Sequence, residues 1–273
     1  MQRKLVIAAW LRRTRSYVHA FAFLLVACPV EAQAPPPLPQ PPGLAAPSEA
    51  APRIKAFPKD LARNFVNVWS GDNVRPFLIG ATATVAAVPA DDAIANYFQD
   101  PSHWQGFDGV GRRLGKSQVL GPAIGVSFLA SRLTDNVKFQ KVTYSLAQGF
   151  IINNAVTGGL KALELRERPD KANHYSFPSG HASNLFMWAT VVSRYYGWKA
   201  GVPAYAFAAY VGTSRLKTQK HYLTDVVAGA AIGYLIGRTV TRADSESASR
   251  RVLWGLSVPP GGGAALTVGV RLW

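Results

Sequence analysis

Apolar blocks of helical length are the feature that most constrains the fold of this chain. Gly, Pro and charged residues separate the blocks, and Ala, Val, Leu and Gly recur within them at helical spacing. The pattern predicts an all-α fold, a compact helical bundle of about six core helices. The blocks are Phe77–Ala90, Val119–Ser131, Lys141–Leu165, Ala182–Tyr196, Pro203–Ser214 and Asp225–Val240.

Most of these blocks are hydrophobic nearly all round, which is typical of helices buried in a core or in a membrane. A block of about fifteen residues spans roughly 22 Å, which is short of the ~30 Å hydrocarbon core of a bilayer. Several blocks also contain Asn, Gln or Arg. We therefore favour a compact bundle of buried helices, and insertion into a membrane is the alternative.

The N-terminal segment has the features of an export signal. Basic residues precede a mostly apolar run, Val18–Val30, and small residues follow. We expect residues 1–32 to be a signal peptide that is cleaved after Ala32. Leu25–Cys28 also resembles the lipobox of bacterial lipoproteins, so a lipid anchor on Cys28 and an uncleaved membrane anchor are the alternatives.

Composition divides the rest of the chain into three parts. Residues 33–56 are rich in Pro and Ala, which is typical of a semi-extended tether. Residues 57–245 hold the helical blocks and are the expected functional domain. Residues 246–273 form a tail in which two alternating runs flank Pro259–Gly263, a pattern that predicts a short C-terminal β-hairpin.

The chain is strongly basic. It has 30 Lys and Arg residues against 15 Asp and Glu residues, a formal net charge of +15, although only 16% of its residues are charged. An excess of base fits nucleic acid, an anionic membrane surface or a phosphorylated substrate about equally well. Composition therefore predicts an anionic partner without choosing among these classes.

Three segments between Lys161 and Asp225 concentrate residues that can bind a phosphate group. In the first segment, Lys161 and Arg168 are separated by nearly two helical turns, and Pro169 follows directly. We therefore expect both cations on one face of a helix that ends at the proline. Taken alone, this segment is better explained as the solvent-exposed basic face of a helix than as a phosphate-binding site.

The second segment, Phe177–His181, opens the next helical block. A proline near the first turn, the Ser179 hydroxyl and the backbone of Gly180 form a natural anion site at a helix N-terminus. The alternative for this segment alone is a capped helix start with an incidental histidine at His181.

The third segment contains Ser214, Arg215, His221 and Asp225. His221 and Asp225 are four residues apart, so one helical turn would let the carboxylate reach a ring nitrogen, fix the tautomer and raise the basicity of the other nitrogen. For this segment alone, an ordinary ion pair on a surface helix is the favoured interpretation.

Together, the spacings Lys-x6-Arg-Pro, Pro-Ser-Gly-His and Ser-Arg-x5-His-x3-Asp resemble the signature of the type 2 phosphatidic acid phosphatase and vanadium haloperoxidase superfamily. The resemblance extends over roughly residues 76–242 and implies a binding site for the phosphoryl oxygens. Its residues would be Lys161, Arg168, Ser179, Gly180 and Arg215.

The resemblance also implies catalytic roles. His221 would be the nucleophile that forms a phosphohistidine, Asp225 would hold its imidazole, and His181 would be the general acid. Members of this superfamily hydrolyse phosphate esters without a metal, and vanadate occupies their phosphate position as a transition-state mimic. We therefore expect no metal and no cofactor, with vanadate as an inhibitor.

We expect an enzyme: an exported, metal-independent phosphatase, a phosphoric ester hydrolase, in the periplasm or cell envelope. Its expected substrates are lipid phosphates or diphosphates of the phosphatidate or polyprenyl diphosphate type. A soluble periplasmic acid phosphatase is the first alternative. A vanadium-dependent haloperoxidase is less favoured, because the short body has little room for the long inserts of that branch.

The expected partners are a phosphorylated small molecule or lipid and a membrane surface, but no nucleic acid. A protein that only binds anionic polymers would not explain the spacing of His221 and Asp225. Of the polar residues outside the signature, His174 is expected in an exposed loop, with contact to the substrate as the alternative. His103, Asp91 and Asp92 are interpreted as loop or helix-end residues.

Overall fold

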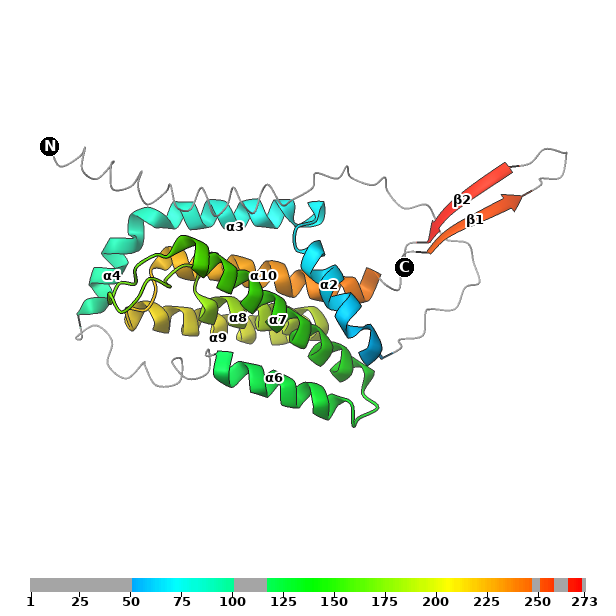
Figure 1. Cartoon of the computed structure of the whole chain (residues 1–273), viewed down its shortest axis with the longest axis horizontal. Helices are drawn as coiled ribbons and strands as arrows, with labels where there is room; N and C mark the ends of the chain where they lie inside the picture. Colours follow the sequence, from blue (N-terminus) through cyan, green and yellow to red (C-terminus); the bar gives the residue numbers. More distant parts are fainter. Residues whose placement is uncertain (1–50, 101–116, 247–250, 258–264, 272–273) are drawn as a thin grey trace.

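The computed structural model describes residues 51–100, 117–246, 251–257 and 265–271. These residues form a bundle of α-helices with a C-terminal pair of strands (Figure 1), which confirms the predicted all-α fold class. The predicted signal peptide and the lipobox-like segment Leu25–Cys28 lie outside the described residues, as does most of the predicted Pro/Ala-rich tether.

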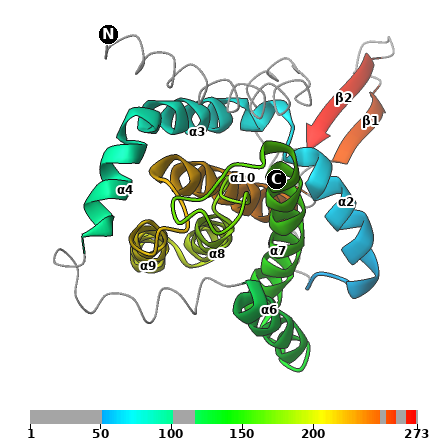
Figure 2. The same ribbon diagram turned by 60° about the vertical axis from the view of Figure 1, so that its left-hand side comes forward.

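Four long helices form the centre of the bundle. They are α7 (Val137–Glu164), α8 (Gly180–Tyr196), α9 (Trp198–Lys217) and α10 (Leu223–Glu246). Helix α8 packs against each of the other three, and α10 also contacts α7 (Figure 2). The three signature segments lie at the ends of these helices, so the packing of the centre decides whether they meet.

Shorter elements surround this centre. On one side, η1 (Ile54–Ala56), α2 (Phe57–Asn67), η2 (Gly71–Asn73), α3 (Val74–Ala87), η3 (Val88–Ala90) and α4 (Asp91–Gln99) follow one another along the chain. Helix α3 packs along α10, and α4 contacts α9 and α10. Figure 2 shows α3 and α4 curving around these two helices, and α6 (Ser117–Ser131) lying against α7.

Every predicted block is helical, but several helices extend beyond their apolar blocks. Helix α7 begins at Val137, and α10 continues to Glu246. At 1.5 Å per residue, the 28 residues of α7 span about 42 Å and the 24 residues of α10 about 36 Å. The length argument for a soluble bundle is therefore wrong, because it measured the apolar blocks and not the helices.

Length and composition would allow two of the described helical stretches to cross a membrane. These are Gly71–Gln99 and Leu223–Arg242. Only 22% of the most apolar window of the first stretch is buried in the bundle, against 56% for the second. The apolar surface of α3 is thus mostly turned away from the protein core.

Polar residues inside the apolar blocks form a buried network between α6, α7 and α8. Asn153 donates to the side chain of Asn184 (2.7 Å) and accepts from Ser183 (2.5 Å). Asn184 in turn donates to Ser117 of α6 (3.0 Å), and Asn154 donates to Asn184 (3.2 Å). Buried polar groups need hydrogen-bond partners. Because these side chains bond one another, they can lie in the buried interface between helices that are otherwise apolar.

Three glycines set the distance between α10 and α8. They are Gly229, Gly233 and Gly237, which follow one face of α10 at intervals of four residues. A Cβ atom at Gly233 would lie 2.2 Å from the carbonyl oxygen of Ser183, and one at Gly229 would lie 2.5 Å from that of Ser179. The backbones of the two helices can approach this closely only because these positions have no side chain.

The C-terminal tail carries the predicted hairpin. Strand β1 (Arg251–Ser257) pairs antiparallel with β2 (Ala265–Arg271), and Trp254 lies opposite Val268.

Candidate active site

The first signature segment is not helical throughout. Helix α7 ends at Glu164, because Leu165 adopts a left-handed conformation with φ of 44°. Arg168 therefore lies in the loop that follows, and the prediction that it shares a helix face with Lys161 is wrong. The turn comes before Pro169, at a non-glycine residue that gives no signal in the sequence.

The loop nevertheless brings Lys161 to the second signature segment. Its Nζ atom donates to the carbonyl oxygens of Tyr175 (2.8 Å) and Pro178 (2.5 Å). Burial lowers the pKa of Lys161 to about 8; the charge of Asp225 raises this pKa and that of Arg168 lowers it. The structure thus brings together residues from all three segments around one ammonium group.

The second segment forms the start of α8. Ser179 is the N-cap, and its buried hydroxyl oxygen accepts from the backbone N–H of Ala182 (3.4 Å). No atom lies within 4 Å of the position that a Cβ would take at Gly180. The helix terminus therefore faces open space, as an anion site at a helix N-terminus requires. His181 lies in the first turn of α8 beside this space.

The third segment is anchored to the second by backbone and side-chain contacts. The backbone N–H of Ser179 donates to the carbonyl oxygen of Asp225 (2.9 Å). His221 is almost fully buried, and its Nδ1 atom lies 2.7 Å from the carbonyl oxygen of Ser176. Because a carbonyl can only accept, Nδ1 carries the proton, and Nε2 of the neutral ring keeps its lone pair.

The charges around His221 favour this neutral form. Burial lowers the pKa of His221 to about 4; Asp225 raises this pKa, whereas Lys161 and Arg215 lower it. Arg215 is itself buried in the last turn of α9. His221 is therefore neutral at pH 7, in the state that a nucleophile needs.

The geometry of Asp225 differs from the expected one. His221 precedes α10, which begins at Leu223, so the two residues are not joined by one helical turn. The distance between His221 Nδ1 and Asp225 Oδ2 is 3.7 Å, too long for a hydrogen bond. The hydrogen bond that sets the tautomer comes from the backbone of Ser176, and Asp225 acts on the imidazole through its charge.

Sequence reasoning missed the partners of Asp225. Its Oδ2 atom accepts from the hydroxyl of Ser176 (2.5 Å) and the backbone N–H of Tyr222 (2.8 Å). Its Oδ1 atom accepts from Arg166 (2.5 Å). Arg166 lies inside the first segment, but the spacing Lys-x6-Arg-Pro selects Arg168, so nothing in the sequence indicates that Arg166 contacts Asp225.

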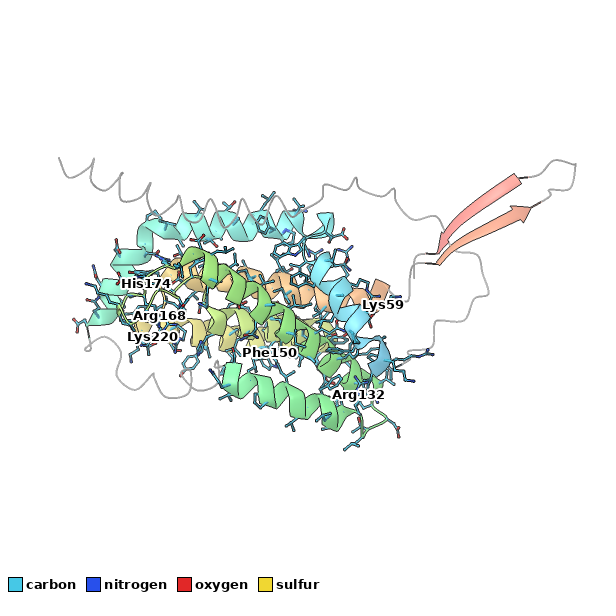
Figure 3. The ribbon with its side chains drawn as sticks, viewed as in Figure 1. Lys59, Arg132, Phe150, Arg168, His174 and Lys220 are labelled. Carbon is cyan, nitrogen blue, oxygen red and sulfur yellow. The ribbon has the colours of Figure 1, made fainter. Side chains whose placement is uncertain are left out.

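The remaining residue of the phosphate-binding prediction, Arg168, also lies at this end of the bundle. Figure 3 labels Arg168, His174 and Lys220 at the same end of the bundle, and the backbone N–H of Arg168 donates to the carbonyl oxygen of Asn173 (3.0 Å). The Nε atom of Arg168 is buried without a hydrogen-bond partner, so it can donate to a bound anion. His174 is exposed in its loop, as expected. His103 lies outside the described residues.

Within the described ranges, no three His, Cys, Asp or Glu side chains lie together in a way that could hold a metal ion. The absence of a cofactor stays a prediction.

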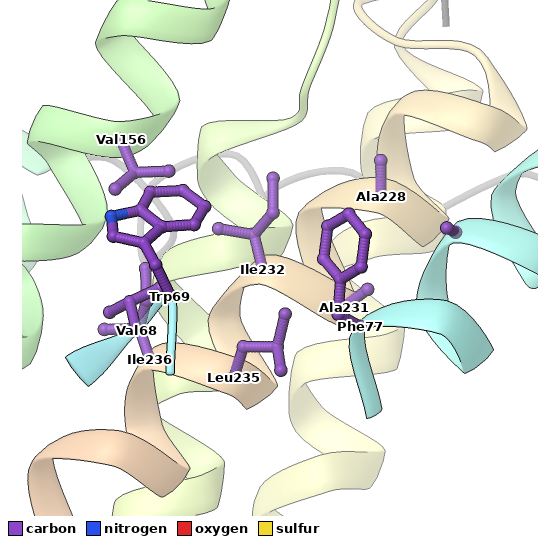
Figure 4. A pocket seen from close by; sticks show the side chains of 10 residues that line it. Val68, Trp69, Phe77, Val156, Ala228, Ala231, Ile232, Leu235 and Ile236 are labelled. Atoms are coloured by element: carbon purple, nitrogen blue, oxygen red, sulfur yellow. The ribbon is translucent and has the colours of Figure 1, made fainter. Parts of the chain in front are cut away.

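An apolar pocket lies between α3, α7 and α10 (Figure 4). Phe77 of α3, Trp69, Val156 of α7 and a face of α10 line it. Ala228, one of its lining residues, is about one helical turn from Asp225 along α10.

Comparisons with known proteins match part of the chain to a known family. Residues 138–248 match the family model of the PAP2 superfamily. Lipid A 1-phosphatase of Porphyromonas gingivalis is 34% identical over 100 residues, which are 36% of this chain and 22% of that protein. Lipid A 4'-phosphatase of Helicobacter pylori is 31% identical over 100 residues, 33% of this chain and 50% of that protein. The chain thus matches half or less of the length of these relatives.

A solved structure shares the fold. The crystal structure of the first transmembrane PAP2 type phosphatidylglycerolphosphate phosphatase from Bacillus subtilis superposes with a TM-score of 0.50 and 22% sequence identity. The match covers 63% of this chain and 96% of that protein.

Proposed function

Because residues 138–248 belong to the PAP2 superfamily, we propose that this protein hydrolyses phosphate monoesters or diphosphates of lipids through a phosphohistidine on His221. The observation that carries the proposal is the hydrogen bond from His221 Nδ1 to the carbonyl oxygen of Ser176 (2.7 Å). It leaves the Nε2 lone pair available beside several cations and the start of α8.

In the first step, the phosphate group lies between the cations and the start of α8. The Nε2 lone pair of His221 attacks phosphorus, a P–N bond forms, and the bond from phosphorus to the ester oxygen breaks. His181 donates a proton to the leaving oxygen. Lys161, Arg168 and Arg215 stabilise the charge on the phosphoryl oxygens as the group transfers.

In the second step, a water molecule attacks the phosphorus of the phosphohistidine. His181, now without its proton, accepts one from the water, and the P–N bond breaks. Inorganic phosphate leaves, and both histidines return to their starting states. The negative charge of Asp225, 3.7 Å from Nδ1, stabilises the positive charge that the imidazole of His221 carries while it is phosphorylated.

Two features favour a lipid over a soluble phosphate ester. Large apolar side chains are exposed along the outer helices, including Ile79 of α3 (62%) and Val126 and Leu129 of α6 (67% each). The apolar pocket begins one helical turn from Asp225 along α10. Exposed apolar surface of this kind marks a membrane or partner surface, and the relatives named above act on lipid A.

We further infer that the protein is exported and that α3 and α10 lie in the membrane, with the site at the membrane surface. The apolar stretches Gly71–Gln99 and Leu223–Arg242 support the membrane location. The signal-like residues 1–32 support export. Alkaline carbonate should leave the full chain in the membrane fraction of expressing cells, and release into the soluble fraction would contradict this inference. Comparing Cys28→Ala with the wild type in this assay would show whether Cys28 contributes an anchor.

The proposed function is tested by phosphate release in detergent micelles with a chelator present. Wild type, His221→Ala and the matched control His174→Ala are compared on phosphatidate, lipid A and a soluble aryl phosphate. We expect release from a lipid by wild type and His174→Ala, and a loss of at least about a thousandfold in His221→Ala.

Each other outcome has a distinct meaning. Equal release by wild type and His221→Ala would overturn His221 as the nucleophile. Release only from the soluble ester would overturn the lipid substrate class in favour of an acid phosphatase. Wild type denatured under alkaline conditions during turnover should carry a phosphate that is stable in base and released by acid, which His221→Ala lacks. Absence of this phosphate under turnover would overturn the phosphohistidine.

A further inference from the structure

A buried chain of charges connects α4 to the third signature segment. The guanidinium of Arg166 donates through Nη1 to Asp225 Oδ1 (2.5 Å) and through Nη2 to Asp91 Oδ2 (2.8 Å). Both carboxylates are fully buried, and the Arg166 side chain is 15% exposed. Arg166 therefore lies between two carboxylates, one beside His221 and one on α4.

Thr224 completes this arrangement. Its backbone N–H and its hydroxyl both donate to Asp91 (2.9 and 2.8 Å), and its hydroxyl oxygen accepts from Arg166 (2.7 Å). The guanidinium also lies 4.0 Å from the ring centre of Tyr222. Charged groups buried with this many hydrogen bonds are held in one geometry. Asp91 is thus more than the helix-end residue that the sequence indicated.

Helix α4 is attached to the same loops at a second point. The side-chain amide of Gln219 donates to the carbonyl oxygen of Ala95 (2.9 Å), and the carbonyl oxygen of Gln219 accepts from the backbone N–H of Asp170 (3.0 Å). Helix α4 thus contacts the chain on both sides of His221. It lies outside residues 138–248, the part of the chain that matches the family model.

The order of charges has a consequence for the nucleophile. The ionised groups that act on His221 are Asp225 of α10, Lys161 of α7 and Arg215 of α9. Arg166, from the loop after α7, lies directly behind Asp225, and Asp91 of α4 lies behind Arg166. The charges in this buried row alternate in sign, so each one partly cancels the electrostatic effect of its neighbour at the His221 imidazole.

We propose that Asp91 and Arg166 are positioning residues that set, through Asp225, the charge experienced by the imidazole of His221. This inference rests on the proposed function. The imidazole gains positive charge when Nε2 attacks phosphorus, and the Asp225 carboxylate stabilises it. Arg166 reduces that stabilisation, and Asp91 reduces the effect of Arg166.

The two residues must then have opposite effects when their charges are removed. Without the Asp91 charge, Arg166 opposes imidazolium formation more strongly, and His221 becomes less basic. Without the Arg166 charge, both carboxylates act on the ring, and His221 becomes more basic. A merely structural role would instead shift the two variants in the same direction.

The experiment is a pH profile of kcat/KM for five variants of the full chain on one lipid phosphate in micelles. They are Asp91→Asn, Arg166→Gln, Arg166→Lys, the double variant Asp91→Asn/Arg166→Gln, and Asp92→Asn. Asp92 is the neighbouring exposed carboxylate of α4 and serves as the matched control. Because all variants share one substrate, its ionisation does not affect the differences between them.

We expect the acidic limb to shift down by about half a pH unit in Asp91→Asn and up by a similar amount in Arg166→Gln. The limb of the double variant should lie between these two. Arg166→Lys and Asp92→Asn should keep the wild-type limb. Near pH 7, kcat of Asp91→Asn should fall roughly threefold to tenfold, with KM within twofold of wild type, because Asp91 is not in the phosphate-binding site.

A second readout does not need turnover. An NMR titration of the His221 ring should shift in the same two directions in Asp91→Asn and Arg166→Gln. Shifts in one common direction, or an Asp91→Asn profile equal to that of Asp92→Asn, would overturn the inference. A wild type without phosphatase activity would overturn the proposed function instead, and the titration would still decide the role of Asp91 and Arg166.

Discussion

Helix α10 has two sides that pack differently. Toward α8, the glycines at 229, 233 and 237 let the two backbones touch, and a Cβ at Gly233 would lie 2.2 Å from a carbonyl oxygen. Toward α3, the helices meet at Gly80 and Ala231 but leave an apolar pocket between Phe77 and Leu235. The side of α10 that faces α8 is packed backbone against backbone, and the side that faces α3 contains a pocket. We call them the tight side and the open side.

This difference follows the chemistry. The segment before α10 carries His221, and the loop before α8 carries Ser179, so the tight contact fixes the proposed nucleophile against the proposed anion site. The open side contains apolar atoms that begin at Ala228 of α10. In the proposed function, the tight side positions the reacting groups, and the open side suits the apolar part of a substrate.

Among the predictions that test this comparison, the largest expected effect is on kcat, when a cation near the start of α8 is removed. Lys161→Met removes one of the cations placed around the phosphoryl group, and we expect kcat to fall about 10²–10³-fold on every substrate. The matched control is Lys199→Met, an exposed lysine at the start of α9. Equal kcat values for the two variants would place Lys161 outside the binding site.

The next effect tests the tight contact itself. Gly233→Ala should destabilise the protein by about 1–3 kcal/mol, because its methyl group would overlap the backbone of α8. Gly158→Ala is the control, since no atom lies within 4 Å of its Cβ position, and it should be neutral or more stable by about 0.5–1 kcal/mol. Unfolding in mild detergent measures both. A neutral Gly233→Ala would show that α8 and α10 are free to separate.

The pH dependence of kcat/KM tests the protonation states of His221 and Lys161 near the tight contact. His221 loses its nucleophilic form when it is protonated as pH falls through its pKa of about 4, and Lys161 loses its charge as pH rises through its pKa of about 8. We expect kcat/KM to form a plateau between these values and to fall about tenfold per unit beyond them. In the variant Lys161→Arg the basic limb should move above pH 8. An unchanged basic limb in this variant would assign it to another group.

The smallest effect concerns the open side. Ala81→Leu adds carbon atoms to the pocket, so we expect KM for a long-chain lipid phosphate to rise about fourfold, roughly the free energy of one buried CH₂ group. KM for a short-chain ester should not change. Ala83→Leu, at an exposed position of the same helix, is the control. Equal changes for both esters would mean that the substrate does not use the pocket.

The sequence predicted the fold class and the helices of the central bundle better than the local geometry around the candidate site. The apolar blocks located the helices of the central bundle, because burial in a core requires that pattern. The block method missed α4, whose sequence begins with two aspartates and is only partly apolar. The block Lys141–Leu165 ends within one residue of α7, but the expectation that this helix continues to Pro169 was wrong, because Leu165 takes a left-handed conformation without a glycine.

The contact between Asp91 and Arg166 could not be predicted from the sequence for a different reason. Asp91 and Arg166 are 75 residues apart, and no spacing rule joins residues that meet only through the packing of α4 against the central helices. The signature residues could be found because each of the three segments has a short internal spacing. The role of Ser176 was hidden because its carbonyl oxygen, a group that every residue has, contacts His221.

Ser176 gives the site an unequal tolerance to mutation. Its carbonyl oxygen accepts from Nδ1 of His221, the proposed nucleophile, and its hydroxyl donates to Asp225. A substitution at this position can remove the second contact but not the first, because every amino acid supplies the carbonyl oxygen. Substitutions at position 176 therefore leave the hydrogen bond that orients His221 in place. The row Asp225, Arg166 and Asp91 consists of side chains, so a single substitution in it can remove a charge and change the row.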